Sequence, residues 1–524
     1  MTATITEVSP RSRWRGRLWL TPSLVDVFFL VLLLAAFGRP QAWQGLLGDG
    51  DTGWHIRTGD FILTTGTVPQ RDLFSFSRPD QPWLAWEWLA DVSFALAHRW
   101  HGLEGVTALS VTVLCGASMV LLSWLLRRGV GLWIGVAVAL AAFSASSVHH
   151  LARPHIYSVL LMTLALWILD QDRERPGRRL WVLVPLSALW ANLHGGFAAW
   201  LATLVVVAAV SALERNRTAV RRYGLLLLLS SAATLLNPYG WRLHRHIFDY
   251  LGSSWIQDHV QEFQSPNFRS ENTLVFAVLL LVGIAVGARA WTGGRRLEVV
   301  LVVVWGIAAL RSARHIPLYC LMAGPLIAAQ CAEWWAAASR RHSARSPVRI
   351  LWELSRDLGQ SHHVSLWTPF VAVVAVPLLA AHAGLGDFPA ARFPVAAVTR
   401  NLDRLRPTGA GPRVMTSDQW ADYLIYRFYP RQRVFFDGRS DFYGPELGTE
   451  YQALLSPGRG WRPKLDRYGF DLALLPVDWP LGALLENDGD WRVLDRDAVS
   501  VLLARRPAAL KQTAGTVECK SVGE

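Results

Sequence analysis

The chain has 524 residues, of which 52% are hydrophobic, and its formal net charge is +12. Its apolar residues stand in long blocks, which is not the pattern of a soluble protein of this size. The positive charge does not indicate a nucleic-acid partner, because the arginines fall in short loops between apolar blocks without a basic, aromatic-rich stripe. Four cysteines lack CxxC or metal spacing, which argues against a disulfide framework or a zinc site: Cys115, Cys320, Cys331 and Cys519.

The apolar blocks approach the roughly 20 residues that a helix needs to cross a membrane. Residues 1–19 are basic and precede an uncleaved first helix, so we predict a cytoplasmic N-terminus. If the arginine-rich loops lie on the cytoplasmic side, the apolar blocks between them must cross the membrane in pairs, as helical hairpins. We therefore predict about eleven spans, near residues 20–38, 104–126, 131–148, 155–170, 180–193, 197–213, 223–237, 274–291, 297–312, 315–335 and 366–384.

The predicted fold is a polytopic α-helical membrane protein with a C-terminal extracytoplasmic α/β domain. The transmembrane domain covers residues 20–385, with long outer loops at 40–100 and 238–273. An odd number of spans places everything after residue 386 outside the bacterial inner membrane. Residues 507–524 are predicted to be a disordered tail.

Acidic residues mark the two long outer loops. Asp49 and Asp51 lie in a glycine-flanked turn, and His55 follows Asp51 after one helical turn. Glu262 lies in the later loop. A solvated turn is the alternative interpretation for the aspartates, but ionisable groups at a membrane edge are costly and tend to be functional.

Cationic residues gather at the outer ends of other spans. Guanidinium groups and imidazole rings donate hydrogen bonds to phosphate oxygens. The following residues therefore predict a phosphate-binding site: Arg153, His155, His194, Arg311, Arg314 and His315. The alternative interpretations are that Arg153 extends toward the membrane surface and that His194 has a structural role.

The segment 386–506 has the composition of a soluble domain. Strands are predicted at 413–416, 433–436, 470–475, 491–494 and 498–504, and a helix at 418–428 with Ser417 or Asp418 as N-cap. Two stretches, 418–426 and 434–443, place aromatic residues beside carboxylates, as a sugar-binding surface does. A core helix and a capped turn explain Trp420 equally well, but explain Asp437, Arg439 and Asp441 less well.

Three segments resemble the GT-C superfamily of lipid-linked-sugar glycosyltransferases. Asp51-Thr-Gly-Trp-His-Ile-Arg-Thr-Gly-Asp-Phe-Ile-Leu-Thr-Thr-Gly66 is similar to the first-loop Asp-x-x-x-His/Tyr…Gly motif of oligosaccharyltransferases. His259-Val-Gln-Glu-Phe-Gln-Ser-Pro266 is similar to their later Glu-containing motif. Ser417-Asp-Gln-Trp-Ala-Asp-Tyr423 is similar to their Trp-Trp-Asp-Tyr acceptor motif. The chain departs from that pattern in Trp-Ala-Asp, in its lower number of spans, and in having His149-His-Leu-Ala-Arg153 where an Asp-x-Asp is expected.

The resemblance implies transfer of a sugar from a polyprenyl-phosphate donor to a glycan, lipid or protein acceptor. It implies a catalytic set of Asp51, Asp49, Glu262 and His55, in which Asp51 handles the acceptor proton. Asp49, Asp51 and Glu262 are also the expected ligands if Mg²⁺ or Mn²⁺ takes part. The acceptor-binding set is Trp420, Asp422, Tyr423, Asp437, Arg439 and Asp441. The alternative is a non-enzymatic transporter or assembly factor, or a polymerase, for an envelope polysaccharide.

Overall fold

The computed structural model describes residues 20–363, 365–405 and 411–507. The predicted cytoplasmic segment 1–19 and nearly all of the predicted tail 507–524 lie outside these ranges. The chain divides into two compact units that are not continuous in sequence. The first unit contains residues 1–46 and 86–385, and the second contains residues 47–85 and 386–524. Residues 47–85 of the predicted first outer loop therefore fold with the C-terminal residues.

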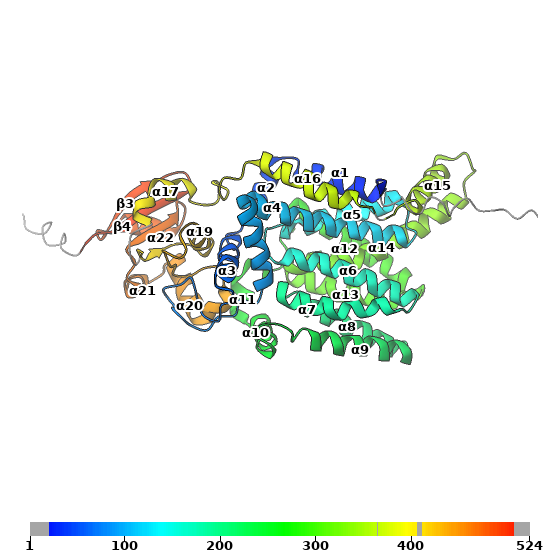
Figure 1. Ribbon diagram of the computed structural model, residues 1–524, viewed down its shortest axis with the longest axis horizontal. Coiled ribbons are helices and arrows are strands. Elements are labelled where there is room, and N and C mark those ends of the chain that lie inside the picture. The colour runs from blue at the N-terminus through cyan, green and yellow to red at the C-terminus, as the bar shows by residue number, and fades with distance from the viewer. Residues whose placement is uncertain (1–19, 364, 406–410, 508–524) are drawn as a thin grey trace, which may run out of the picture. The chain divides into compact units, whose positions relative to one another are not determined.

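The first unit is a bundle of helices (Figure 1). Its helices are α1 Leu24–Phe37, α2 Pro40–Leu46, α4 Trp88–Arg127, α5 Leu132–Ser146, α6 His155–Glu174, α7 Leu183–Leu193, α8 Phe197–Leu213, α9 Arg217–Ala233, α10 Trp241–Gly252, α11 Ser254–His259, α12 Glu271–Thr292, α13 Arg296–Arg311, α14 Ile316–Arg340, α15 Pro347–Gln360 and α16 Trp367–Ala383. Each of the eleven predicted spans overlaps one of these helices. Helices α2, α10, α11 and α15 have no counterpart among the predicted spans, and the number of crossings stays a prediction.

Four helices, or helices with their flanking turns, are long and apolar enough to cross a membrane: α4, residues 132–149, α12 and residues 313–340. The bent pair α1 and α2 forms a fifth candidate if it counts as one span. On α12 the side chains of Val278, Leu281 and Ile284 are each more than half exposed, at 58%, 67% and 66%. Apolar surface on that scale is expected to face lipid rather than water. These features mark a multi-pass membrane protein.

Helix α14 forms the core of the first unit and packs against α5, α12 and α13. Its Tyr319 is fully buried and donates a hydrogen bond to the Leu279 carbonyl of α12 at 3.0 Å. Gly283 makes this approach possible, because a Cβ there would lie 2.5 Å from the Tyr319 hydroxyl. Satisfying a buried hydroxyl on a neighbouring backbone carbonyl fixes the register of the two helices.

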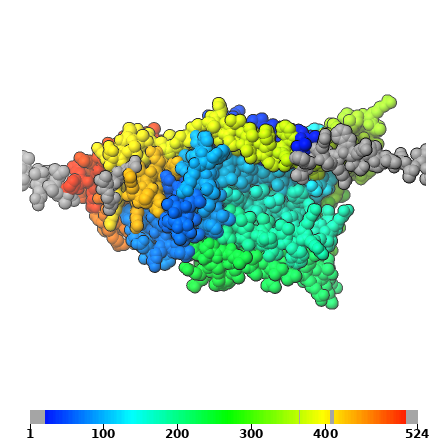
Figure 2. Space-filling view, viewed as in Figure 1, coloured from blue at the N-terminus to red at the C-terminus, as the bar shows by residue number. Residues whose placement is uncertain are grey.

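Helices α1 and α16 lie side by side, and Figure 2 shows the yellow atoms of α16 along the blue atoms of α1. The buried carboxylate of Asp26 joins them. It accepts hydrogen bonds from the Ser365 hydroxyl at 2.6 Å and from the Thr368 backbone N–H at 3.0 Å. The first and last helices of the bundle are thus held together by a charged acceptor with several donors, which offsets the cost of burying its charge.

The second unit combines a small sheet with helices (Figure 1). Its elements are α3 Thr52–Thr65, α17 Val395–Arg400, α18 Leu402–Leu405, β1 Val414–Met415, α19 Asp418–Phe428, α20 Ser440–Leu455, α21 Trp461–Tyr468, β2 Leu472–Pro476, α22 Pro480–Glu486, β3 Trp491–Arg496 and β4 Ser500–Arg505. The strand order is β1-β2-β4-β3. Strands β1 and β2 are parallel, with Val414 opposite Leu472, and the other two pairings are antiparallel.

The predicted helix at 418–428 coincides with α19, and Ser417 caps it by accepting a hydrogen bond from the Trp420 N–H at 3.1 Å. Four of the five predicted strands are present. The prediction of a strand at 433–436 was wrong, because Val434 forms only an isolated bridge to Ser75. The neighbouring Phe435 and Phe436 are buried among aromatic rings instead.

Candidate functional site

In the second unit, the start of α3 lies against α19 at very short range. The Gly50 N–H donates to the Gln419 side chain at 2.7 Å. A Cβ on Gly53 would lie 2.5 Å from the Asp422 carbonyl oxygen, so only glycine permits this approach. The Gly-Asp-Thr-Gly sequence at 50–53 therefore brings the Asp51 carboxylate to the Asp422 side of α19.

Asp51 and Asp422 meet at Gly438. The Gly438 N–H donates to both Asp422 carboxylate oxygens, at 3.1 and 3.2 Å. A Cβ at Gly438 would lie 1.9 Å from Asp51 Oδ1 and 2.8 Å from Asp422 Oδ2, so both carboxylates occupy the space that this glycine leaves. Burial, followed by the charges of Asp51 and Asp437, raises the pKa of Asp422 well above its ordinary value. The charges around Asp422 therefore favour the protonated form of its carboxyl group in the folded protein.

The other residues predicted near Asp51 also lie in this unit. Asp49 Oδ1 accepts from the Asp51 N–H at 3.0 Å, and His55 is 1% exposed with its ring 3.6 Å from that of Trp54. Asp418 was not predicted as a site residue. Burial together with the charge of Asp49 raises the pKa of Asp418. Four carboxylates on two elements thus surround the start of α3.

Most of the predicted acceptor-binding residues are buried and have partners inside the second unit. Arg439 is 2% exposed and pairs with Asp437 at 2.7 Å and with Asp72 at 2.8 Å. The Trp420 indole donates to the Arg392 carbonyl at 2.8 Å, and the buried Tyr423 hydroxyl donates to Asp387. These side chains hold the unit together and present little surface to an acceptor. Asp441 alone of the predicted six is partly exposed.

In the first unit, Glu262 lies between two arginines. Its carboxylate oxygens are 3.8 Å from Arg153 Nη1 and 3.9 Å from Arg314 Nη1. The guanidinium of Arg314 also covers the Phe263 ring at 4.3 Å. Burial alone would raise the pKa of Glu262, but the charges of Arg314 and Arg153 lower it well below its ordinary value. Glu262 is therefore ionised, and the cluster keeps an excess of positive charge.

Three histidines border this arginine cluster. His155 Nε2 lies 2.5 Å from the His149 carbonyl oxygen, and its ring centre is 6.4 Å from that of His194. Arg314 Nη1 and His149 Nε2 are both buried and lack a hydrogen-bond partner among the described residues. Buried donors without acceptors are rare and often mark a bound ion or a catalytic group. An anionic oxygen would satisfy the Arg314 donor.

His194 has a defined tautomer. Its Nδ1 accepts from the Gly196 N–H at 2.9 Å and lies 2.7 Å from the Ser158 hydroxyl, which itself accepts from the Trp190 indole at 2.7 Å. The proton of the neutral ring is therefore on Nε2, which lies 3.5 Å from a carboxylate oxygen of Glu87. Glu87 and His149 were not assigned to the site from the sequence, although His149 begins the quoted segment 149–153.

Two predicted phosphate residues are placed differently. Arg311 is exposed at the last position of α13 and forms no ion pair with Glu262. His315 Nδ1 lies 3.3 Å from the Ala308 carbonyl oxygen, and its ring packs 5.8 Å from Trp305. The candidate anion-binding group therefore consists of Arg153, Arg314, His149, His155 and His194 around Glu262, and we refer to these six residues as the Glu262 cluster.

The predicted metal ligands are divided between the units. Asp49 and Asp51 belong to the second unit and Glu262 to the first. Across residues 20–363, 365–405 and 411–507, no group of three or more His, Cys, Asp or Glu side chains is arranged to hold a metal ion. Participation of Mg²⁺ or Mn²⁺ stays a prediction.

No protein-family model matches the sequence, and no curated protein is significantly similar to it. Solved structures are similar in fold. Oligosaccharyltransferase AglB of Archaeoglobus fulgidus, in complex with an inhibitory peptide and a dolichol-phosphate, has a TM-score of 0.57 and 11% identity over 86% of this chain and 69% of its own. The same organism's oligosaccharyltransferase tethered to an acceptor peptide has a TM-score of 0.58 and 12% identity over 86% of this chain and 68% of its own.

ArnT of Cupriavidus metallidurans, bound to undecaprenyl phosphate, has a TM-score of 0.50 and 13% identity. That match covers 92% of this chain and 98% of ArnT. At this level of identity the likeness concerns the fold. The chain has a fold similar to those of AglB and ArnT.

Proposed function

We propose that the chain is an integral-membrane glycosyltransferase of the GT-C type. It transfers a hexosyl or pentosyl group from a polyprenyl-phosphate-linked donor to an envelope acceptor, which is a glycan, a lipid or a protein. The reaction takes place at the outer face of a bacterial inner membrane that the chain crosses about eleven times. The neighbours' ligands, dolichol-phosphate and undecaprenyl phosphate, support this class of donor.

One observation carries the proposal. The Glu262 cluster holds a buried donor, Arg314 Nη1, that lacks a hydrogen-bond acceptor among the described residues. It stands beside more cationic than anionic groups. A phosphate leaving group gains negative charge as its bond to the sugar breaks, and preformed donors aimed at such a charge lower the barrier. Arg153, His155 and His194 complete the expected phosphate site.

The carboxylates of the second unit supply the other half of the chemistry. The bond from the sugar anomeric carbon to the phosphate oxygen breaks, and a bond from that carbon to the acceptor heteroatom forms. The acceptor proton passes to Asp51, and the raised pKa of the neighbouring Asp422 favours a neutral carboxyl group beside it. Asp49 and His55 support Asp51, and Asp441 is the remaining candidate for acceptor contact.

Radiolabelled polyprenyl-phosphate sugars incubated with the purified full-length protein test this proposal. Asp51→Asn keeps the shape of the side chain but cannot accept a proton, so transfer should fall at least 100-fold while the donor KM changes little. Asp80→Asn, at an exposed position of the same unit, is the matched control. Addition of EDTA shows whether a divalent cation is required.

Arg314→Gln should raise the donor KM and lower kcat, because it removes charge that meets the phosphate in both the bound and the reacting state. Arg269→Gln removes an exposed arginine of the loop that carries Glu262 and should leave both constants unchanged. Full activity of Asp51→Asn would remove that residue from the mechanism. Movement of intact lipid-linked sugar across vesicles, without transfer, would instead support the transporter alternative.

A further inference from the structure

A second basic site lies in the first unit, where α4 and α6 end. A cavity of about 630 Å³ is bounded by the last residues of these helices and by the loop that follows α6. Four arginines line it: Arg127 from α4, and Arg175, Arg178 and Arg179 from the loop. Ligand pockets commonly have volumes of roughly 300–1,000 Å³, so a phosphate headgroup with part of its backbone fits.

This cavity is remote from the Glu262 cluster. Helix α6 begins at His155, which is a member of that cluster, and ends at Glu174, which lines the cavity. A continuous helix of this length extends about 30 Å, which is close to the thickness of the hydrocarbon core. The two basic sites therefore lie at opposite ends of one membrane-scale helix.

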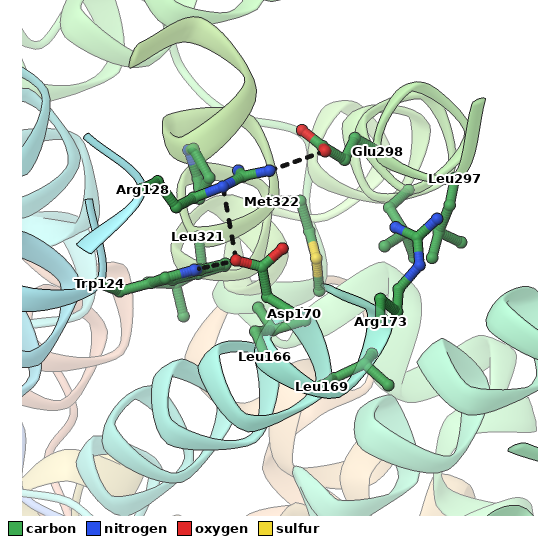
Figure 3. Close-up of a pocket in the computed structure, with 12 residues that line it drawn as sticks. Trp124, Arg128, Leu166, Leu169, Asp170, Arg173, Leu297, Glu298, Leu321 and Met322 are labelled. Atoms are coloured by element: carbon green, nitrogen blue, oxygen red, sulfur yellow. Dashed lines mark hydrogen bonds and ion pairs between the residues drawn. The ribbon is translucent and has the colours of Figure 1, made fainter. Parts of the chain in front are cut away.

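The neighbouring Arg128 has a structural role and lies outside this cavity. Arg128 donates to Glu298 at 2.9 Å and lies 3.4 Å from Asp170, which also accepts from the Trp124 indole at 2.6 Å (Figure 3). The space beside it measures only about 40 Å³, little more than one water molecule occupies. Arg128 ties α4 to α6 and α13, and it has no capacity left for a ligand.

Asp172, one of two acidic residues in the cavity wall, is paired with Arg222. Asp172 accepts from Arg222 Nε at 2.8 Å, from Arg222 Nη2 at 2.5 Å and from the Gly177 N–H at 2.9 Å. The same guanidinium donates to the Gly177 carbonyl and lies over the Trp181 ring. These bonds fix the loop that presents the arginines, and they leave Glu174 as the one carboxylate of the lining without such a partner.

The four lining arginines differ from Arg128 and Arg222 in having no ion pair with any residue that the structure describes. Arg127 is held in place by its stacking over Trp167, at 5.2 Å from the ring centre. Several guanidinium groups that have no ion pair among the described residues favour binding of a phosphate in a concave site on an ordered loop, because its oxygens accept pairs of N–H hydrogen bonds from arginine. Basic pockets between membrane helices bind lipid headgroups in the same way.

We propose that this cavity binds a phosphate-bearing anion on the membrane face opposite the transfer site. The anion is either the headgroup of a phospholipid in that leaflet or a soluble phosphate compound. The shared chemistry is a phosphate held by Arg127, Arg175, Arg178 and Arg179. Binding here does not depend on the proposed transfer reaction, because none of the four arginines belongs to the Glu262 cluster.

The test uses the full-length protein in nanodiscs of phosphatidylcholine. The apparent melting temperature and native mass spectrometry report binding of added phosphatidylglycerol, and inorganic phosphate is added as the soluble probe. We expect phosphatidylglycerol to stabilise the wild type and the variant R175Q/R178Q/R179Q to bind it at least tenfold more weakly. The matched control R340Q/R341Q/R345Q removes three exposed arginines elsewhere and should bind like the wild type.

The arms of the experiment separate the sources. Stabilisation by phosphatidylglycerol that inorganic phosphate does not compete away assigns the site to a lipid headgroup, and competition or direct stabilisation by phosphate assigns it to a soluble anion. R175K/R178K/R179K keeps the charge and should retain part of the affinity, which shows that the loop remains folded. Equal binding by the Gln triple variant and the wild type, or equal losses in both triple variants, would overturn the proposal.

Discussion

At the scale of single residues, the protonation of Asp422 sets the charge beside Asp51. Burial and the neighbouring charges of Asp51 and Asp437 raise the pKa of Asp422, so the folded protein holds a proton that the unfolded chain releases. The stability from this proton is complete below the ordinary carboxyl pKa of 3.8 and is lost as pH rises through the raised value. The second unit should therefore become less stable as the solution becomes more alkaline.

Asp422→Asn tests this dependence. The amide oxygen can still accept from the Gly438 N–H, but the side chain no longer titrates. We expect the variant to gain stability relative to the wild type as pH rises from 5 to 9, measured by apparent melting temperature in detergent. Asp80→Asn, which is exposed, should show no such trend. A difference between Asp422→Asn and wild type that does not change with pH would contradict the raised pKa.

Gly438 makes a second prediction at this scale. An alanine Cβ would lie 1.9 Å from Asp51 Oδ1, so Gly438→Ala must displace the carboxylate or the backbone. We expect a loss of about 1–3 kcal/mol in the free energy of unfolding, typical of overpacking. Transfer should fall at least tenfold, since Asp51 moves. Gly458→Ala, where a Cβ meets nothing within 4 Å, is the control, and equal transfer by both variants would separate Asp51 from catalysis.

At the scale of elements, Arg439 joins the segment after α3 to the start of α20. Its guanidinium pairs with Asp72 and Asp437 and lies 4.5 Å from the centre of the Trp83 ring. Arg439→Met should cost about 3–5 kcal/mol in the free energy of unfolding, because it leaves two buried carboxylates without their cation. Arg467→Met breaks an exposed pair with Glu450 and should cost at most about 1 kcal/mol. Similar costs measured by denaturant titration would refute the structural role of Arg439.

Local pattern predicts many elements of this chain and misses others for identifiable reasons. Helix α8 begins and ends at the predicted residues 197 and 213, because an uninterrupted apolar block defines it. Helices α10 and α15 were not predicted, because each is amphipathic, with one polar and one apolar face, and contains no uninterrupted apolar block. The strand predicted at 433–436 failed because long-range aromatic packing determines the conformation there.

For the candidate site, the contacts between segments far apart in the chain could not be predicted from the sequence. The residues Asp51 and Glu262 were identified from local motifs, but Asp422 was assigned to acceptor binding and not to the carboxylate pair with Asp51. The two elements that carry this pair are separated by 369 positions at the contact of Gly50 with Gln419. Glu87 was not singled out because nothing local distinguishes it, and only the fold brings it to His194.

At the scale of the whole molecule, the direction in which the chain crosses the membrane decides which face holds each site. The described residues form a helix at each of the eleven predicted spans, and four of these helices, two of them counted with their flanking turns, have the length and hydropathy of a span. Helix α16 is critical, because it is the last predicted crossing before the second unit resumes at Gly386. Its 17 residues extend about 26 Å, slightly less than the hydrocarbon core.

Cysteine labelling tests this last crossing. Ser343→Cys lies before α16 and Glu446→Cys lies after it, both at exposed positions. In a background without native cysteines, an impermeant maleimide should label Glu446→Cys in right-side-out vesicles and Ser343→Cys only in inverted ones, because arginine-rich loops stay in the cytoplasm. Labelling of both from the same side would mean that α16 does not cross. The reverse pattern would invert the protein and place the arginine-lined cavity, not the Glu262 cluster, on the outer face.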